Sequence, residues 1–238
     1  MADSRAIPAR FNGPPDSGHG GYSAGLAASL VEGAAEVALR APPPLETPFA
    51  VEHRDDGSVA LLDEGQVVLE ARPATIDVEV PPPVSVEEAA AAEAESPFLA
   101  DSHPFPTCFA CGPRRAEGDG LRLFAGPVAG REVFAAVWTP AAEFATDGAA
   151  VDPLFVWTAL DCPSSAPAMS GDTIVLASLA AELRAPVRVG EPHVIGSWEI
   201  ERDGRKRFSG VALWDGTGAV CATGRALWIE LRTQETGT

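Results

Sequence analysis

The sequence predicts an α+β protein made of two similar halves. In each half, a short apolar segment that begins with a helix-start signal is followed by several strand-like segments separated by turns. The first apolar segment follows Gly18-His19-Gly20-Gly21, and the second follows Asp152-Pro153. Such a repeat is typical of a duplicated unit. We therefore divide the chain into an N-terminal unit, residues 1–82, a connector, residues 83–118, and a C-terminal unit, residues 119–238.

The N-terminal unit is expected to begin with a helix and to continue as short strands. Residues 16–18 offer helix-capping side chains, residues 22–31 place apolar side chains near one another on one helical face, and Gly33 would end the helix. The acidic, glycine-containing turns at residues 55–57 and 63–65 separate the segments that follow. Strands are predicted at residues 37–40, 49–54, 58–62, 67–72 and 76–80.

The connector and the C-terminal unit carry equally clear local signals. A proline run at residues 81–83, followed by an alanine and glutamate tract, predicts a connector that includes a solvated helix. Asp152 as N-cap and Pro153 at the first helical position predict a helix that Pro163 stops. Asp-Gly pairs at residues 203–204 and 215–216 predict hairpin turns. Strands are predicted at residues 121–124, 133–138, 174–184, 193–201, 207–214 and 220–231.

Composition narrows the class of partner. The chain has 17 basic and 34 acidic residues, so its net charge of -17 disfavours nucleic acids. An anionic ligand would need helix N-termini or a few arginines to hold it. No apolar run approaches the roughly 20 residues that span a bilayer, and the first residues lack the apolar segment of a signal peptide. We therefore expect a soluble, cytoplasmic protein with no membrane partner and with its four cysteines reduced.

Two features suggest a catalytic site. A helix that starts at Gly20 and Gly21 exposes backbone N–H groups that could stabilise a thioester oxyanion, although two glycines can also simply form a tight turn. Asp161 lies near the end of an otherwise apolar helix, where burial and the helix dipole would raise its pKa and suit it to act as a general base. The alternative for Asp161 is a structural hydrogen bond to Ser164 or Ser165.

Other motifs favour structural roles. Cys108 and Cys111 have the spacing of half a zinc knuckle with His103 nearby, but the fourth ligand is missing from the sequence pattern, and Cys162 and Cys221 lie in apolar contexts. We therefore expect a structured turn there, with no metal and no cofactor. The tryptophans are expected to pack in the core, with one or two able to line an acyl pocket.

The pattern of His19-Gly20-Gly21, Asp161 and the repeated strands resembles the hotdog-fold acyl-CoA thioesterases over most of residues 6–82 and 119–232. The resemblance implies a double hotdog, that is, two fused units, each with a central helix wrapped by a curved antiparallel sheet. In the phenylacetyl-CoA type, a histidine-glycine-glycine stretch faces an aspartate at a fixed offset in the partner unit. In the C-terminal half, the aspartate position counted from Asp152 is occupied by Asp161. In the N-terminal half, the position counted from His19 is occupied by Ala28. The resemblance therefore implies one asymmetric site, because only one half supplies the carboxylate.

The chain also resembles the fused type II acyl-CoA thioesterases, in which a serine or threonine and a glutamine accompany the aspartate. Here Ser178 is present, but Ala180, Ala181 and Glu182 occupy the polar motif, and Arg225 replaces the glutamine. The resemblance thus implies Asp161, Gly20 and Gly21 as catalytic residues. The side chains assigned to substrate binding are those of His19, Tyr22, Trp157, Ser178, Arg205 and Arg207, the last two as contacts for a CoA phosphate.

We therefore expect an acyl-CoA thioesterase-like hydrolase that acts on an acyl-CoA or related thioester at a site between the two halves. One alternative is a non-catalytic acyl or small-ligand binding protein that kept the fold. A third hypothesis is a dehydratase or hydratase, which would need a histidine and an acid in one cleft, such as His19 and Asp161. Because hotdog units often pair further, a homodimer of the fused chain is also expected.

Overall fold

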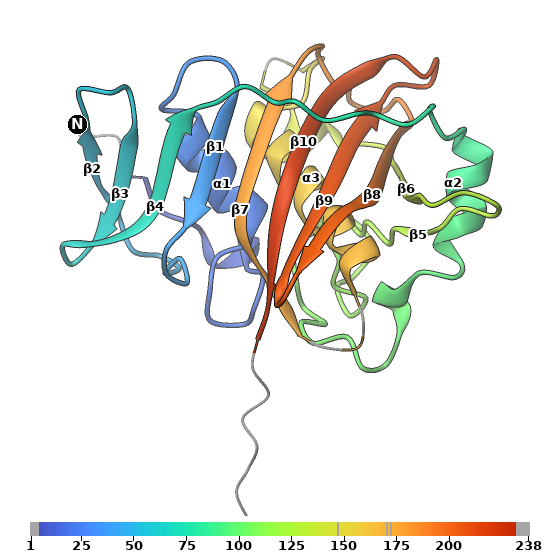
Figure 1. The fold of residues 1–238 in the computed structure, drawn as a ribbon, viewed down its shortest axis with the longest axis horizontal. Helices are drawn as coiled ribbons and strands as arrows, with labels where there is room; N and C mark the ends of the chain where they lie inside the picture. The colour runs from blue at the N-terminus through green and yellow to red at the C-terminus, as the bar shows by residue number, and fades with distance from the viewer. Residues whose placement is uncertain (1–4, 147, 170, 172, 232–238) are drawn as a thin grey trace, which may run out of the picture.

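A single antiparallel sheet organises the whole molecule (Figure 1). The computed structural model of the protein describes residues 5–231 except 147, 170 and 172. The strand order is β2-β3-β4-β1-β7-β10-β9-β8-β6-β5. The strands are β1 (Ala35–Leu39), β2 (Ala50–His53), β3 (Val59–Asp63), β4 (Gln66–Pro73), β5 (Gly126–Pro127), β6 (Phe134–Trp138), β7 (Ile174–Leu183), β8 (His193–Asp203), β9 (Lys206–Trp214) and β10 (Val220–Glu230).

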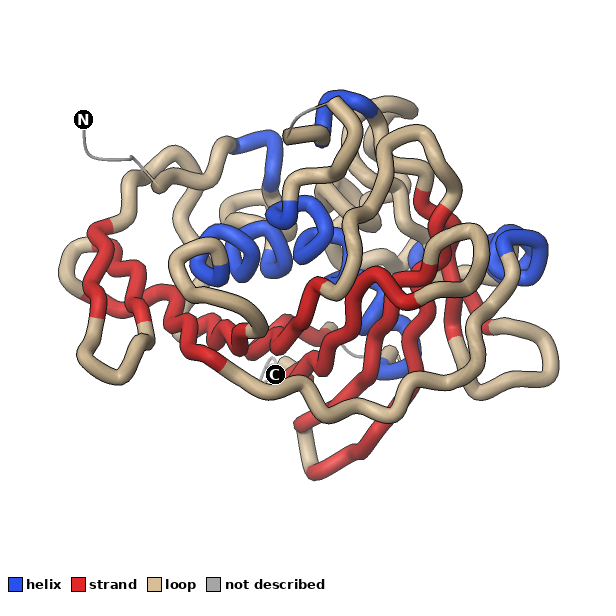
Figure 2. The backbone as a smooth tube through the Cα atoms, turned by 90° about the horizontal axis from the view of Figure 1, so that it is seen from above, coloured by secondary structure: helices blue, strands red, loops and turns tan. Residues whose placement is uncertain are grey.

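Two central helices, α1 (Gly20–Ala28) and α3 (Pro153–Ser165), lie side by side on one face of the sheet (Figure 2). A third helix, α2 (Val86–Glu93), packs against β6 near the β5 edge of the sheet. Short 3-10 helices occur at Ala9–Phe11, Pro97–Leu99, Ala142–Phe144 and Ala166–Ala168. No helix in the described ranges has the length and apolar character needed to cross a bilayer. The prediction of an α+β protein is confirmed.

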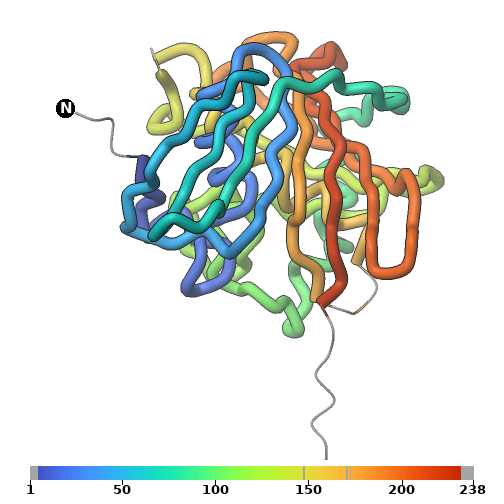
Figure 3. Tube along the Cα trace, turned by 60° about the vertical axis from the view of Figure 1, so that its left-hand side comes forward, coloured from blue at the N-terminus to red at the C-terminus, as the bar shows by residue number. Residues whose placement is uncertain are grey.

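The strand pair β1 and β7 joins the N-terminal and C-terminal parts of the sheet (Figure 3). Val37 of β1 is opposite Leu179 of β7, and Ala35 is opposite Ala181, with all four side chains essentially inaccessible to solvent. The predicted strands at residues 37–40, 49–54, 58–62 and 67–72 correspond to β1–β4, and those from residue 133 onward correspond to β6–β10. Alternation of buried and exposed side chains is a local property, which explains why the sequence pattern locates these strands.

Helix α1 starts where the glycine pair predicts, but its cap differs from the expected one. His19 is the N-cap, and its Nδ1 accepts a hydrogen bond of 3.2 Å from the Tyr22 amide. The helix ends at Ala28 with Ser29 as C-cap, earlier than the predicted residue 31. Gly33 lies after that end at a φ of +75°, in the left-handed region that glycine adopts without strain.

Helix α3 starts as predicted, because Asp152 accepts a hydrogen bond from the Leu154 amide at 2.9 Å and Pro153 occupies the first position. The predicted stop at Pro163 is wrong, since the helix continues to Ser165. Proline cannot donate to the carbonyl one turn earlier. The hydroxyls of Ser164 and Ser165 donate back to the carbonyls of Asp161 and Cys162 at 2.6 and 2.7 Å. These bonds satisfy carbonyls in the last turn and let the helix continue.

Segment 76–80 is not a strand. Instead of lying beside a strand, the chain after β4 crosses the face of the sheet opposite to α1 and α3 on its way to α2 (Figures 1 and 2). A segment that runs across the strands has no neighbour with which to form a ladder. Helix α2 then begins with a capping box, in which the Ser85 hydroxyl accepts from the Glu88 amide and the Glu88 carboxylate accepts from the Ser85 amide.

The segment around the cysteine pair is part of the core. Phe109 is fully buried, and its amide donates to the Asn12 carbonyl at 2.8 Å. Its ring packs edge-on against Phe11 with the centroids 4.8 Å apart. The predicted strand at 121–124 does not form, because the Leu121 and Leu123 amides donate to the carbonyls of Phe109 and Ala110 instead of to the sheet. The cysteine turn is therefore held against the start of the chain.

Candidate functional site

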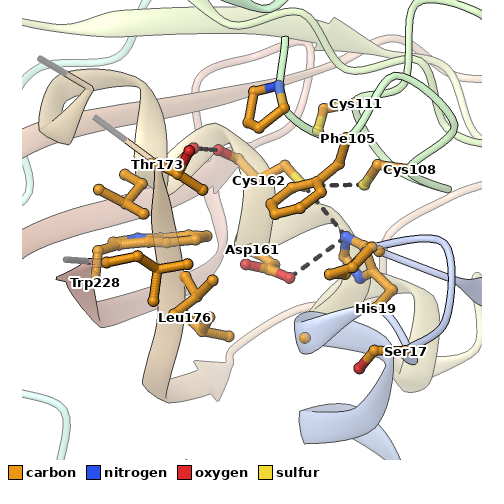
Figure 4. Close-up of a pocket in the computed structure, with 18 of the residues that line it drawn as sticks. Ser17, His19, Phe105, Cys108, Cys111, Asp161, Cys162, Thr173, Leu176 and Trp228 are labelled. Atoms are coloured by element: carbon orange, nitrogen blue, oxygen red, sulfur yellow. Dashed lines mark hydrogen bonds and ion pairs between the residues drawn. The ribbon is translucent and has the colours of Figure 1, made fainter. Parts of the chain in front are cut away.

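A cavity of about 540 Å³ opens at the N-terminal end of α1 and lies between residues that are distant in sequence. This volume is in the range of pockets for small organic ligands. Its polar wall includes His19 and Gly20 from the start of α1 together with Asp161 of α3, and an apolar wall is formed by Leu176 of β7 and Trp228 of β10. Figure 4 shows Asp161 between these two walls.

Asp161 is the central carboxylate of the cavity. Its side chain is almost completely buried, and its Oδ2 accepts a hydrogen bond of 2.5 Å from the amide of Gly21. Among the described residues, none donates a hydrogen bond to its buried Oδ1. Burial raises the pKa of Asp161 to about 6, although the His19 charge and the Gly21 amide both oppose the shift. The carboxylate is thus held at one oxygen and open at the other.

His19 lies beside that carboxylate, with its Nε2 3.4 Å from Asp161 Oδ2 (Figure 4). Because Nδ1 accepts the Tyr22 amide, the proton of the neutral ring is assigned to Nε2, which faces Asp161 and the thiol of Cys162 at 3.2 Å. Burial lowers the pKa of His19, but the negative charges of Asp161 and Cys108 outweigh it, so the pKa lies above its ordinary value. An acid and a base therefore share a proton-transfer contact on the cavity wall.

The two glycines play different parts in this geometry. The amide of Gly21 is engaged by Asp161, and a Cβ at Gly21 would lie 2.5 Å from the Asp161 Cβ and 2.7 Å from the Trp157 carbonyl. Only glycine therefore allows the carboxylate to reach this helix start. Gly20 lines the cavity, and its amide, as the first of the helix, has no intrahelical acceptor. The positive end of the α1 dipole also faces the site.

Three cysteines meet on the same wall, an arrangement that the sequence pattern did not reveal. Cys108 Sγ lies 3.6 Å from Cys162 Sγ, and Cys111 also lines the cavity (Figure 4). The neighbouring thiols of Cys111 and Cys162, together with the His19 charge, lower the Cys108 pKa well below its ordinary range. The paired cysteines were the only sequence signal, since Cys162 and His19 reach them only through folding.

His103, which the sequence analysis placed beside the cysteine pair as a possible third metal ligand, is a further polar residue of the cavity. Its Nδ1 accepts a hydrogen bond of 3.0 Å from the Phe105 amide. Its Nε2 is buried and has no hydrogen-bond partner among the described residues. Burial lowers the pKa of His103, which favours a neutral ring with Nε2 as donor. His103 could therefore donate to a ligand in the cavity.

Two of the predicted substrate-binding residues pack in the core instead of lining the cavity. Tyr22 stacks on Phe11 with the ring centroids 4.3 Å apart, and burial raises its pKa to about 12. Trp157 is buried on α3, where its backbone and Cβ face the glycines of α1. Within the described chain, neither residue belongs to the cavity lining. The packing of these two residues fixes where α1 lies and so affects the site indirectly.

The remaining three predicted residues lie on the strands around the cavity. Ser178 of β7 is opposite Ala38 in the pair with β1, outside the described cavity lining. Arg207 forms an ion pair with Glu230 at 2.7 Å, and Arg205 donates to the Glu230 carbonyl at 3.0 Å. The next residue, Leu231, lines the cavity. The two arginines are therefore near one end of the cavity but do not form its wall.

The architecture is that of the hotdog fold, an α+β fold in which a large antiparallel sheet carries its helices on one face. Solved thioesterases of the TesB type share it over nearly the whole length of this chain. The tesB protein of Mycobacterium avium subsp. paratuberculosis superposes with a TM-score of 0.60 and 13% identity, covering 95% of this chain and 91% of its own.

Two further solved structures have the same fold as this chain. The acyl-CoA thioesterase II TesB2 of Mycobacterium marinum has a TM-score of 0.57 and 12% identity, with 93% of this chain and 92% of its own covered. A hotdog-fold protein of unknown function from Alicyclobacillus acidocaldarius has a TM-score of 0.57 and 13% identity, with 96% and 92% covered. Neither a family model nor a curated protein matches the sequence. At these identities the likeness concerns the fold.

Proposed function

We propose that the protein is an acyl-CoA thioesterase-like hydrolase with a composite site between two fused hotdog units. The observation that carries the proposal is the 2.5 Å contact between Gly21 N of α1 and Asp161 Oδ2 of α3 on the wall of one cavity. In this proposal the units are residues 1–82 and 119–238, and residues 83–118 connect them. The similarity in fold to an acyl-CoA thioesterase II supports the reaction class.

The proposed reaction uses Asp161 as the general base. The free Oδ1 takes a proton from a water molecule as its oxygen attacks the thioester carbonyl carbon. The Gly20 amide, at the positive end of α1, donates to the oxyanion, while Gly21 holds Oδ2 in place. When the intermediate collapses, the carbon–sulfur bond breaks, and the leaving thiolate recovers the proton from Asp161. His19 stabilises the charged carboxylate from the side.

The proposed substrate position follows from the walls of the cavity. An acyl chain would pack against Leu176 and Trp228, both of which are largely buried and apolar. A CoA phosphate would meet Arg205 and Arg207 near Leu231, because local cations are needed on a chain with a net charge of -17. We further propose a cytoplasmic homodimer as the working form, and the four free thiols support a reducing setting.

The direct test is thiol release from a panel of acyl-CoAs by the wild type, Asp161→Asn and Asp215→Asn. The Asp161→Asn variant keeps the shape and an acceptor for Gly21 but cannot act as a base, so we expect turnover to fall about 10²- to 10⁴-fold. The control, Asp215→Asn, changes an aspartate in the turn after β9 and should retain activity. Equal rates in the wild type and Asp161→Asn would refute the assigned role. Saturable binding without release would favour the non-catalytic alternative.

A second reaction class is favoured by one specific contact, the 3.4 Å separation of His19 Nε2 and Asp161 Oδ2 in the same cavity. This is the acid and histidine pair that hydration or dehydration of an acyl thioester needs. Incubation with α,β-unsaturated acyl-CoAs distinguishes the two classes. Loss of the conjugated absorbance without thiol release would indicate a hydratase, whereas thiol release with saturated substrates indicates the hydrolase.

A further inference from the structure

Three potential metal ligands converge at the junction of the connector with the two central helices, and a fourth, Cys111, lies on the same cavity wall. The Nε2 of His19 and the Sγ atoms of Cys108 and Cys162 all lie within 4.8 Å of one another. Cys111, three residues after Cys108, lines the same cavity as these residues. All four side chains are at most 7% exposed.

The turn that carries the cysteine pair has the form of a metal-binding knuckle. The Gly112 amide donates to the Cys108 carbonyl at 2.9 Å, and a Cβ on Gly112 would lie 2.5 Å from that oxygen. The tight turn therefore requires glycine directly after the second cysteine, and both cysteines line the cavity together with Cys162. The donor set of three thiols and one imidazole matches the soft ligands and fourfold coordination that zinc prefers.

We propose that Cys108, Cys111, Cys162 and His19 bind a divalent soft metal ion, with zinc as the natural occupant. Three thiolates neutralise the ion and leave one net negative charge. The metal would displace the proton from Nε2 of His19, so the ring would carry its proton on Nδ1 and lose the bond from the Tyr22 amide. Losing one helix-cap bond is a small cost beside the affinity of thiolates for zinc.

The position of the site suggests what it does. Cys108 and Cys111 belong to the connector, Cys162 follows Asp161 on α3, and His19 caps α1. A bound ion would thus clamp the connector against both helices and fix one wall of the cavity. This inference stands on the donor set and the turn and does not need the proposed hydrolysis; with an ion bound, His19 would hold the metal and no longer stabilise the charge of Asp161.

The test measures metal directly. The wild type and the variants Cys108→Ser, Cys111→Ser, Cys162→Ser and Cys221→Ser are purified under reducing conditions, and their zinc content is determined by elemental analysis. Cys221 is the matched control because it is a buried, free cysteine on β10 outside the cluster. We expect about one zinc ion per chain in the wild type and the control. Each cluster variant should bind more weakly by at least about tenfold.

Cobalt substitution gives a readout that does not depend on the variants folding. Adding Co²⁺ to the metal-free, reduced wild type should produce thiolate-to-cobalt charge-transfer bands with the intensity of three thiolate ligands, together with the visible bands of tetrahedral cobalt. Absence of these bands, with all four thiols titrating as free, would overturn the proposal. It would also be overturned if the cluster variants bound zinc as tightly as Cys221→Ser.

Discussion

The carboxyl group of Asp161 is held between two opposing influences. Burial in the cavity wall disfavours its charge, whereas the Gly21 amide and the neighbouring His19 favour it. Burial is the larger effect, so the pKa lies at about 6, above the ordinary value of 3.8. The group is therefore largely ionised near neutral pH but remains basic enough to take a proton from water. A surface aspartate would be a weaker base.

We expect the proposed thioesterase activity to depend on pH through this group. Because the ionised carboxylate is the active form, kcat/KM should reach half of its plateau near the pKa of about 6 and fall about tenfold for each further pH unit below it. The measurement is a pH–rate profile with an acyl-CoA substrate. The residual activity of Asp161→Asn should lack this acid limb. A flat wild-type profile across this range would contradict the assignment of Asp161 as base.

Helices α1 and α3 bring the site together because they pack unusually closely. The contact is made by Gly21 and Gly25, one turn apart on α1, against the backbone of Trp157 and Leu154 on α3. A Cβ on Gly25 would lie 2.9 Å from the Trp157 Cβ and 3.1 Å from the Leu154 carbonyl. Small residues at this spacing allow two helix backbones to approach each other.

Replacing Gly25 by alanine should therefore lower the free energy of unfolding. The added methyl group forces the helices apart, at a typical cost of about 1–3 kcal/mol, and this exceeds the gain of up to about 1 kcal/mol that alanine brings inside a helix. Denaturant unfolding of Gly25→Ala against the wild type measures the difference. Gly25 is outside the described cavity lining, so the substitution acts on the packing of the helices and changes no side chain of the cavity wall. An unchanged or higher midpoint would show that the helices can separate without strain.

The larger of two apolar cores extends across both proposed units. One cluster of buried apolar side chains includes Leu61 and Val37 of the N-terminal strands as well as Leu160, Leu179 and Leu213 from the C-terminal part. The pairing of β1 with β7 makes the sheet continuous through this core. Neither part can unfold without exposing apolar surface on the other.

We therefore expect a single cooperative unfolding transition, even though the sequence divides into two similar halves. Leu61→Ala in β3 and Leu213→Ala in β9 remove fully buried side chains from opposite parts of the sheet. Each should destabilise the same transition by about 2–5 kcal/mol. Calorimetry of the wild type and both variants tests this. Two transitions, each shifted by only one of the variants, would show that the units unfold independently.

Local chemistry in the sequence determined the elements and the class of fold. Asp152 and Pro153 start a helix wherever they precede an apolar segment, because a side-chain oxygen satisfies a free amide and proline needs none. The turn before β4 could be predicted from its acidic residues and glycine, and in the structure Glu64 and Gly65 adopt positive φ values of 47° and 84° there. The same reasoning identified Gly20, Gly21 and Asp161 as residues of interest, since glycine and a buried acid are exceptional in apolar helices.

Only the tertiary structure decided which of these residues meet. Gly21 and Asp161 are 140 positions apart, and Cys108 and Cys162 are 54 apart, so no local pattern sets their distance. The close packing of α1 on α3 brings the first pair together, and folding of the connector into the core brings the second. Burial, which gives Asp161 its raised pKa, likewise depends on side chains from the whole chain. Sequence periodicity specifies which face of a helix or strand is apolar, whereas tertiary packing determines which other element covers that face.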